Sequence, residues 1–167
     1  VEARAAVEWA LNYVGPVYIR FGRLAVPVVF DEADYKFEFG KNLTVREGTD
    51  VTIMATGTML YMAIEAAEKL AEEGISARVT NVHTIKPIDK DDIIDAAKTT
   101  GCIVTAEEHN ILGGLGSAVA EVVCENCPVP VLRVGVEDKF GKSGKVPALL
   151  EAYGLTTENI VAKAKAA

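Results

Sequence analysis

From about Thr44 to its end, the chain alternates short apolar runs with longer segments in which apolar residues recur every three or four positions. The short runs predict strands and the periodic segments predict helices. We expect strands at 51–56, 75–82, 102–106 and 131–136. The first is apolar almost throughout, as in strands buried on both faces, whereas the second alternates and predicts one drier face. This order predicts an α/β fold, a mostly parallel sheet with helices on both faces.

Residue types at the ends of the periodic segments predict where the helices begin and end. In the first helix, Thr58 is placed to cap the start and Gly74 to end it. Glu65 and Lys69 are spaced to pair on its outer face. The other helices are expected at 90–98, 117–124, 146–153 and 157–166.

The first 43 residues follow a different pattern. Residues 3–14 carry an apolar stripe and predict a helix, which Gly15 and Pro16 end. Residues 17–21 are rich in β-branched and aromatic side chains and predict a strand. Residues 24–43 show no helical period, and we interpret them as a linker on the surface of a larger body.

The composition is typical of a globular protein, because half of the 167 residues are hydrophobic and a quarter are charged. A formal net charge of −7 disfavours a nucleic-acid-binding surface. No apolar run approaches the ~18 residues of a membrane span, and the first residues lack the order of a signal peptide. We therefore expect a cytoplasmic protein that binds neither nucleic acid nor membrane. Because the chain begins at Val1 and not at Met, we expect it to be part of a longer polypeptide.

The three cysteines, Cys102, Cys124 and Cys127, form no disulfide framework. Cys124 and Cys127 have the spacing of a redox pair or of half a zinc site. A second Cys/His pair is missing, and the two thiols end a helix instead of beginning one, where thiols are more reactive. We favour a structural role for them in a reducing compartment.

Polar residues and a glycine-rich turn, at 107–117, come directly after the strand at 102–106. Functional residues gather at this edge of a parallel sheet. Gly114-Leu115-Gly116, with Glu137 further on, invites a dinucleotide-binding interpretation. However, Val119 stands where that motif needs a small residue, and residues 107–112 separate the glycines from the strand. We favour glycines that let another segment or subunit approach closely.

The sequence contains two histidines, His83 and His109. With Glu107 and Glu108, His109 could form a carboxylate–imidazole pair suited to proton transfer. No serine or cysteine nucleophile is obviously arranged with it, so we favour an interface or hydrogen-bonding role. His83 precedes a turn at Pro87 and is expected to brace it. Local chemistry alone makes the chain a weak candidate for a self-sufficient enzyme.

Several segments, in order along nearly the whole chain, resemble signatures of the transketolase family. Gly-Pro-Val-Tyr-Ile-Arg-Phe-Gly-Arg at 15–23 resembles the end of its pyrimidine-binding domain. The others resemble its third, C-terminal domain: 52–57, 84–89, 107–117, 138–144 and 153–156. Asp-Lys-Phe-Gly-Lys-Ser-Gly at 138–144 is similar to transketolases more than to other thiamine-diphosphate enzymes.

The resemblance implies that residues 44–167 form a three-layer C-terminal domain whose five-stranded sheet has one antiparallel strand. Residues 24–43 would be a linker, and residues 1–23 the tail of the pyrimidine-binding domain. A protease should then cut before about Thr44 and spare the remainder. No catalytic, cofactor-binding or metal-binding residue is implied here, because thiamine diphosphate and Mg²⁺ would be held by upstream domains across a dimer interface.

The resemblance also implies roles for particular residues. Arg23 matches the arginine that holds the sugar phosphate in transketolases, and a guanidinium fork suits that group; an ordinary surface arginine is the alternative. Arg20, three residues earlier on a strand, would point to the opposite face. The third domain is thought to support assembly, and the expected interface residues are Glu108, His109, Asn110, Gly113, Gly114 and Gly116.

We therefore expect the C-terminal part, or the smaller subunit, of a transketolase that moves two-carbon ketol units between sugar phosphates. It would be inactive alone and would associate with an N-terminal transketolase part and with copies of itself. Two alternatives stay open. One is a non-catalytic dimerisation or regulatory module. The other is the equivalent region of 1-deoxyxylulose-5-phosphate synthase or of a 2-oxoacid dehydrogenase β subunit.

Overall fold

The computed structural model describes residues 1–23 and 25–167, and its centre is a five-stranded sheet. The strands, in the spatial order β1-β3-β2-β4-β5, are β1 Leu43–Arg46, β3 Ala77–Asn81, β2 Val51–Ala55, β4 Ile103–Asn110 and β5 Val131–Val136. β1 runs antiparallel to β3, and the other neighbours are parallel. The predicted sheet, mostly parallel with one antiparallel strand, is confirmed.

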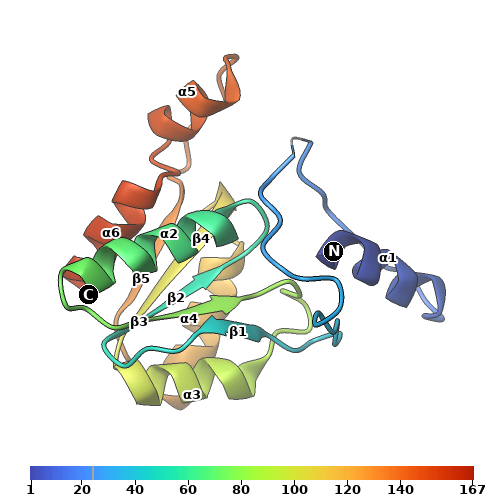
Figure 1. Cartoon of the computed structure of the whole chain (residues 1–167), viewed down its shortest axis with the longest axis horizontal. Coiled ribbons are helices and arrows are strands. Elements are labelled where there is room, and N and C mark those ends of the chain that lie inside the picture. Colours follow the sequence, from blue (N-terminus) through green and yellow to red (C-terminus); the bar gives the residue numbers. More distant parts are fainter. Residues whose placement is uncertain (24) are drawn as a thin grey trace.

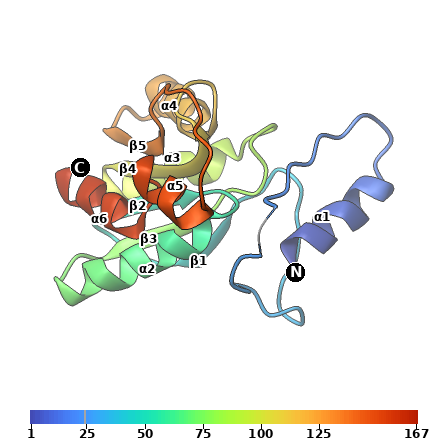
Figure 2. The same ribbon diagram turned by 90° about the horizontal axis from the view of Figure 1, so that it is seen from above.

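Helices cover both faces of this sheet, as expected (Figures 1 and 2). On one face, α2 (Met59–Glu72) and α6 (Thr157–Ala166) pack against each other and against the strands. On the other face lie α3 (Lys90–Thr100) and α4 (Leu115–Asn126). The short helix α5 (Val146–Ala152) joins β5 to α6, and α1 (Glu2–Leu11) lies on an arm beside the three layers.

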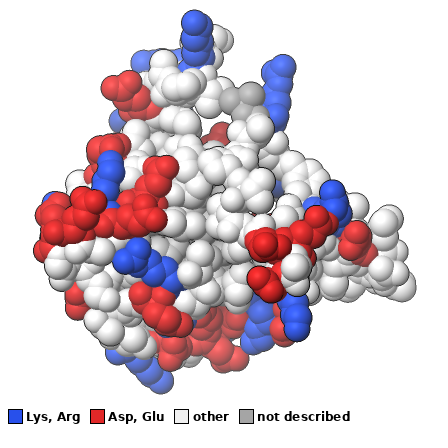
Figure 3. All heavy atoms as spheres, viewed as in Figure 1, with Lys and Arg blue, Asp and Glu red and all other residues white. Residues whose placement is uncertain are grey.

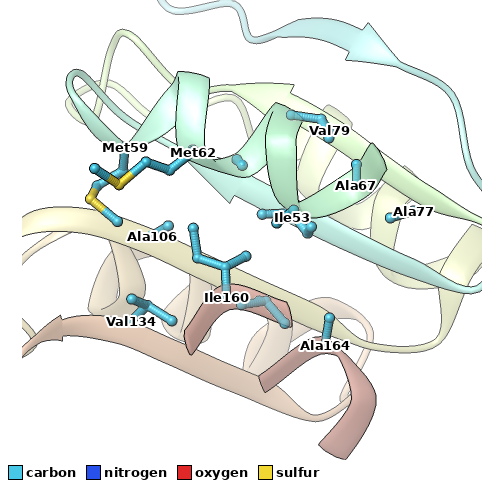
Figure 4. Close-up of a cluster of buried hydrophobic side chains, with 14 of the residues drawn as sticks. Ile53, Met59, Met62, Ala67, Ala77, Val79, Ala106, Val134, Ile160 and Ala164 are labelled. Atoms are coloured by element: carbon cyan, nitrogen blue, oxygen red, sulfur yellow. The ribbon is translucent and has the colours of Figure 1, made fainter. Parts of the chain in front are cut away.

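Alternate residues of the buried strands supply two apolar cores. In β2, Ile53 faces α2 and α6, whereas Met54 faces α3 and α4. Figure 4 shows the first core, where Ile53 and Val134 lie near Ile160 of α6 and Val79 lies near Ala67 of α2. Burial of each such side chain contributes about 1.5–3 kcal/mol, so the apolar run that predicted β2 also stabilises the sheet between its two helical layers.

Local signals explain the ends of α3 better than those of α2. The side chain of Asp89 caps α3 by accepting a hydrogen bond from the backbone N–H of Asp92, and Gly101 ends it in the left-handed conformation (φ 70°). Thr58 does precede α2, but its own backbone is helical (φ −54°) and its side chain makes no capping hydrogen bond within the described chain. The predicted side-chain cap at Thr58 is therefore wrong.

The predicted pair of Glu65 with Lys69 is also wrong. Lys69 Nζ donates to Glu158 Oε1 at 2.7 Å, and Glu65 Oε2 accepts from the hydroxyl of Thr157 at 2.9 Å. Both side chains thus join α2 to the start of α6. Their true partners lie about 90 residues away, beyond the reach of any rule based on helix spacing.

Two strands differ from their predictions. All five residues of β3 are buried, so the predicted difference in burial between its two faces is wrong. Arg78 of β3 is buried because Asp92 and Asp95 of α3 accept from its guanidinium at 2.6 and 2.7 Å. β4 was predicted to end at 106 but extends to Asn110, because β5 continues beside it and Asn110 pairs with Val136.

The predicted strand at 17–21 is wrong for this chain, since those residues form neither helix nor strand. A strand needs a neighbour, and none of the described strands pairs with this segment; its Tyr18 is 87 % exposed. α1 is shorter than predicted and is held to residues 25–42 by stacking of Trp9 on Phe39, with ring centroids 4.0 Å apart. The division at 23 and 43 into tail, linker and domain stays a prediction.

Surface charge is mixed. On the face drawn in Figure 3, carboxylates gather at both sides of the molecule, with basic side chains interspersed among them. Among the helices described, none has the length and apolar character needed to cross a bilayer.

Candidate functional site

The polar residues that end β4 lie at the carboxyl edge of the sheet, between β2 and β5. Along this strand end, Glu107 is buried at 1 % exposure, whereas Glu108 and His109 are exposed. The backbone N–H of Ile111 donates to the carbonyl of Val136 at 3.0 Å, which keeps this end on β5. The expected interface residues Glu108, His109, Asn110 and Gly113 therefore lie together on one exposed strand end and turn.

Glu107 fixes the start of α4. Its carboxylate accepts from the backbone N–H of Leu115 at 2.7 Å and from that of Gly116 at 2.8 Å. A helix start has unpaired N–H groups and a partial positive charge, so a buried carboxylate suits this position. This role of Glu107 was not predicted from the sequence. The available signal was an acid at a strand end that precedes a glycine-rich helix start.

The glycines of the turn permit close approach by side chains of the same chain. A Cβ atom on Gly114 would lie 1.9 Å from Glu107 Oε2. One on Gly116 would lie 2.7 Å from Cδ of Arg133 and 2.8 Å from Oγ1 of Thr105. Gly116 is buried and Gly114 is partly exposed, so of these two only Gly114 has surface open to another subunit.

His109 does not form the carboxylate–imidazole pair that we considered. Its Nδ1 lies 2.8 Å from the backbone carbonyl oxygen of Asn110. Asn110 in turn donates through Nδ2 to Asp138 Oδ1 at 2.9 Å and accepts from the backbone N–H of Leu112 at 2.8 Å. These contacts make the end of β4 and the residues after β5 one connected surface.

The segment 20–23 runs along the same edge of the sheet. Arg20 Nη2 donates to the backbone carbonyl of Glu108 at 3.0 Å. Gly22 lies at the start of α2, where a Cβ atom would be 3.4 Å from Oγ1 of Thr58. Arg23 is exposed, and its role in phosphate binding stays a prediction.

His83, after β3, has the local contacts expected of a residue that braces a turn. Its Nδ1 lies 2.8 Å from Oγ1 of Thr84, and its ring centroid is 4.6 Å from that of Phe37. Burial lowers the pKa of His83 below its ordinary value, and the nearby carboxylate of Glu2 opposes that shift.

The lowered pKa of His83 predicts a loss of stability in acid. The folded state binds this proton less readily than the unfolded state, whose pKa is about 6.5. The stability that neutral His83 contributes is therefore fully present above pH ~6.5. It is lost as the pH falls toward the lower pKa of the folded state. Unfolding free energies measured from pH 7.5 to 5 should decrease for the native sequence. They should decrease less for His83→Gln, and equal slopes would contradict this.

The cysteine pair lies at the end of a helix, and its structural role stays a prediction. α4 ends at Asn126, so Cys124 lies in its last turn and Cys127 directly after it, as predicted. Within the described residues, no group of three or more Cys, His, Asp or Glu side chains could hold a metal ion.

Two hollows lie among the described residues, and their linings do not suit a diphosphate cofactor. One, of about 300 Å³ between α2 and the α5–α6 region, is lined by Glu65, Glu151 and Glu158. The other, of about 320 Å³ beside residues 30–36, has Asp31 and Asp34 in its lining. These carboxylates would repel a diphosphate.

Comparison with known proteins agrees with the architecture. Residues 40–160 match the family model described as the transketolase C-terminal domain. Over 160 residues the chain is 50% identical to the 6-deoxy-6-sulfo-D-fructose transketolase subunit SqwH of Clostridium sp. (strain MSTE9), covering 96% of this chain and 49% of that protein. It is 42% identical over 166 residues to 1-deoxy-D-xylulose-5-phosphate synthase of Heliobacterium modesticaldum, covering 98% of this chain and 26% of the synthase.

A solved structure described as a split gene transketolase, inactive beta4 tetramer, superposes with a TM-score of 0.94 at 52% identity. The match covers 98% of this chain and 54% of that one. The chain thus spans about half the length of the subunit-type relatives that it matches. The ordered signatures, the sheet with its single antiparallel strand and these matches agree, and the chain belongs to the transketolase family as its C-terminal domain.

Proposed function

We propose that this chain is the C-terminal part of a split-type transketolase subunit, in an enzyme that transfers two-carbon ketol units between sugar phosphates. Thiamine diphosphate and Mg²⁺ would be bound by other parts of that enzyme. The observation that carries the proposal is the agreement at about 50% identity with two subunit-type transketolases along nearly the whole chain.

The arm that carries α1 exposes several large apolar side chains, as expected of a surface that a neighbouring domain covers. Leu11 is 81 %, Val14 97 %, Tyr18 87 % and Val28 83 % exposed. Isolated apolar residues on a surface are ordinary, but so many on one short arm are typical of a covered surface. We infer that the preceding pyrimidine-binding domain covers them.

Assembly would involve more than one type of contact. The solved relative is described as an inactive tetramer of one subunit type. We infer that this chain also associates with copies of itself through the exposed strand end and turn. This surface consists of Glu108, His109, Asn110, Gly113 and Gly114. The buried Gly116 supports the turn. An N-terminal transketolase part would complete the active assembly.

The test is reconstitution. The subunit containing this chain, purified and mixed with the N-terminal transketolase part, is assayed for ketol transfer from a ketose phosphate to an aldose phosphate. We expect transfer only from the mixture. A mixture that forms a complex and stays inactive would indicate a dimerisation or regulatory module instead.

A second candidate function rests on the 42% identity to a 1-deoxy-D-xylulose-5-phosphate synthase. The two activities differ in the donor, which is pyruvate for a synthase of that kind and a ketose phosphate for a transketolase. The same reconstituted complex should consume the ketose phosphate and leave pyruvate unchanged. Consumption of pyruvate with release of carbon dioxide would favour the synthase.

A further inference from the structure

We propose that Arg20 is a positioning residue for Arg23: the carboxyl edge of the C-terminal domain holds Arg20 and thereby presents the Arg23 guanidinium to the phosphate of the sugar substrate. The inference rests on the proposed function and extends it, because it gives the C-terminal domain a part in substrate binding.

The first step is the contact of Arg20 with β4. Its guanidinium donates to the backbone carbonyl of Glu108 at 3.0 Å, across 88 residues of sequence. A charged donor makes this bond stronger than a neutral one. The acceptor is itself fixed, because Asn110 is bonded to Asp138 and the N–H of Ile111 to the carbonyl of Val136.

The second step is the contact at Gly22. A Cβ atom there would lie 3.4 Å from Oγ1 of Thr58, so the backbone passes close to the start of α2. Arg20 is therefore bonded to the end of β4, and Gly22 lies beside the start of α2, the helix that follows the neighbouring strand β2. The hydrogen bond of Arg20 and the close approach at Gly22 place this short segment against the carboxyl edge of the sheet.

The side chain of Arg23 is exposed, and it forms no hydrogen bond or ion pair with any residue that the structure describes. Because Arg20 is engaged with β4, Arg23 is the arginine of this segment that is left for a ligand. A free guanidinium fork suits a phosphate monoester, which it can bind with two parallel hydrogen bonds.

The experiment uses the reconstituted enzyme and compares KM for a ketose phosphate with KM for an unphosphorylated ketose. The variants are Arg20→Ala, Arg23→Ala and the double variant. Arg46→Ala, in the edge strand β1, is the matched control. We expect Arg23→Ala and Arg20→Ala each to raise KM for the ketose phosphate, the former roughly tenfold, with KM for the unphosphorylated ketose unchanged. Because Arg20 acts through Arg23, the double variant should be no worse than Arg23→Ala.

Hydrogen exchange on the same complex reports positioning directly. Backbone amides of residues 20–23 should exchange faster in Arg20→Ala and at the native rate in Arg46→Ala. Unchanged exchange would contradict the proposal.

The kinetic outcomes separate the two proposals. If Arg23→Ala raises KM and Arg20→Ala does not, the positioning role is wrong and the proposed function stands. If the effects of the two variants multiply in the double variant, Arg20 contacts the phosphate itself and the positioning role is again wrong. An unchanged KM for Arg23→Ala would remove phosphate binding from Arg23 and overturn the inference, and an enzyme without ketol transfer would overturn the proposed function.

Discussion

Glu107→Ala is expected to lower the free energy of unfolding of this chain by about 3 kcal/mol. The substitution removes a carboxylate that is 1 % exposed and accepts from the backbone N–H groups of Leu115 and Gly116. Both donors would stay buried without a partner, and α4 would lose a negative charge at its positive end. Chemical denaturation in urea measures the change.

The neighbour in sequence provides the matched control. Glu108 lies on the same strand end but is exposed, so Glu108→Ala should change the free energy of unfolding by no more than about 0.5 kcal/mol. Gly114→Ala should resemble Glu107→Ala, because its Cβ would occupy the place of Glu107 Oε2. Equal stabilities of the two glutamate variants would contradict the role assigned to Glu107.

Gly48→Ala is expected to destabilise the chain by about 3 kcal/mol or more, through a clash that no side-chain movement can relieve. The added Cβ would lie 2.2 Å from the carbonyl carbon of Ala77 and 2.2 Å from the backbone nitrogen of Arg78. The backbone cannot move away easily, because Thr49 and Asp50 both donate to the carbonyl of Ser76. Thermal unfolding should show a lower midpoint.

Gly141→Ala is the control for this substitution. No described atom lies within 4 Å of its added Cβ, so its midpoint should match that of the native sequence. A Gly48→Ala variant as stable as Gly141→Ala would show that the close approach of residue 48 to β3 is wrong.

The elements that the sequence predicted well are those specified by neighbouring residues. The apolar run of β2 places Ile53 on one core and Met54 on the other, and α3 begins at the predicted residue 90, directly after the capping Asp89. These signals act over a few residues, so they are visible without knowledge of the tertiary structure.

The errors arose where a distant partner decides the outcome. Lys69 was assigned a partner on its own helix, but α6 offered Glu158, and the drier face predicted for β3 was lost because Asp92 and Asp95 cover Arg78. The segment 17–21 has strand-forming residues without a described strand beside it. β1 was expected only from the family resemblance, because its four half-buried residues show no alternation.

The position of the candidate site could be predicted from the sequence, but the interactions within it could not. The polar stretch after β4 does lie at the carboxyl edge, yet its central residue is the buried Glu107 and not His109. The contact of Arg20 with Glu108 joins residues far apart in sequence, so no spacing rule could have indicated it.

The central claim is that this chain supports a reaction whose cofactor is bound elsewhere in the enzyme. Calorimetric titration of thiamine diphosphate with Mg²⁺ tests it most directly, first into this chain alone and then into its complex with the N-terminal transketolase part. We expect heat of binding only from the complex. Micromolar binding to the chain alone would contradict the claim.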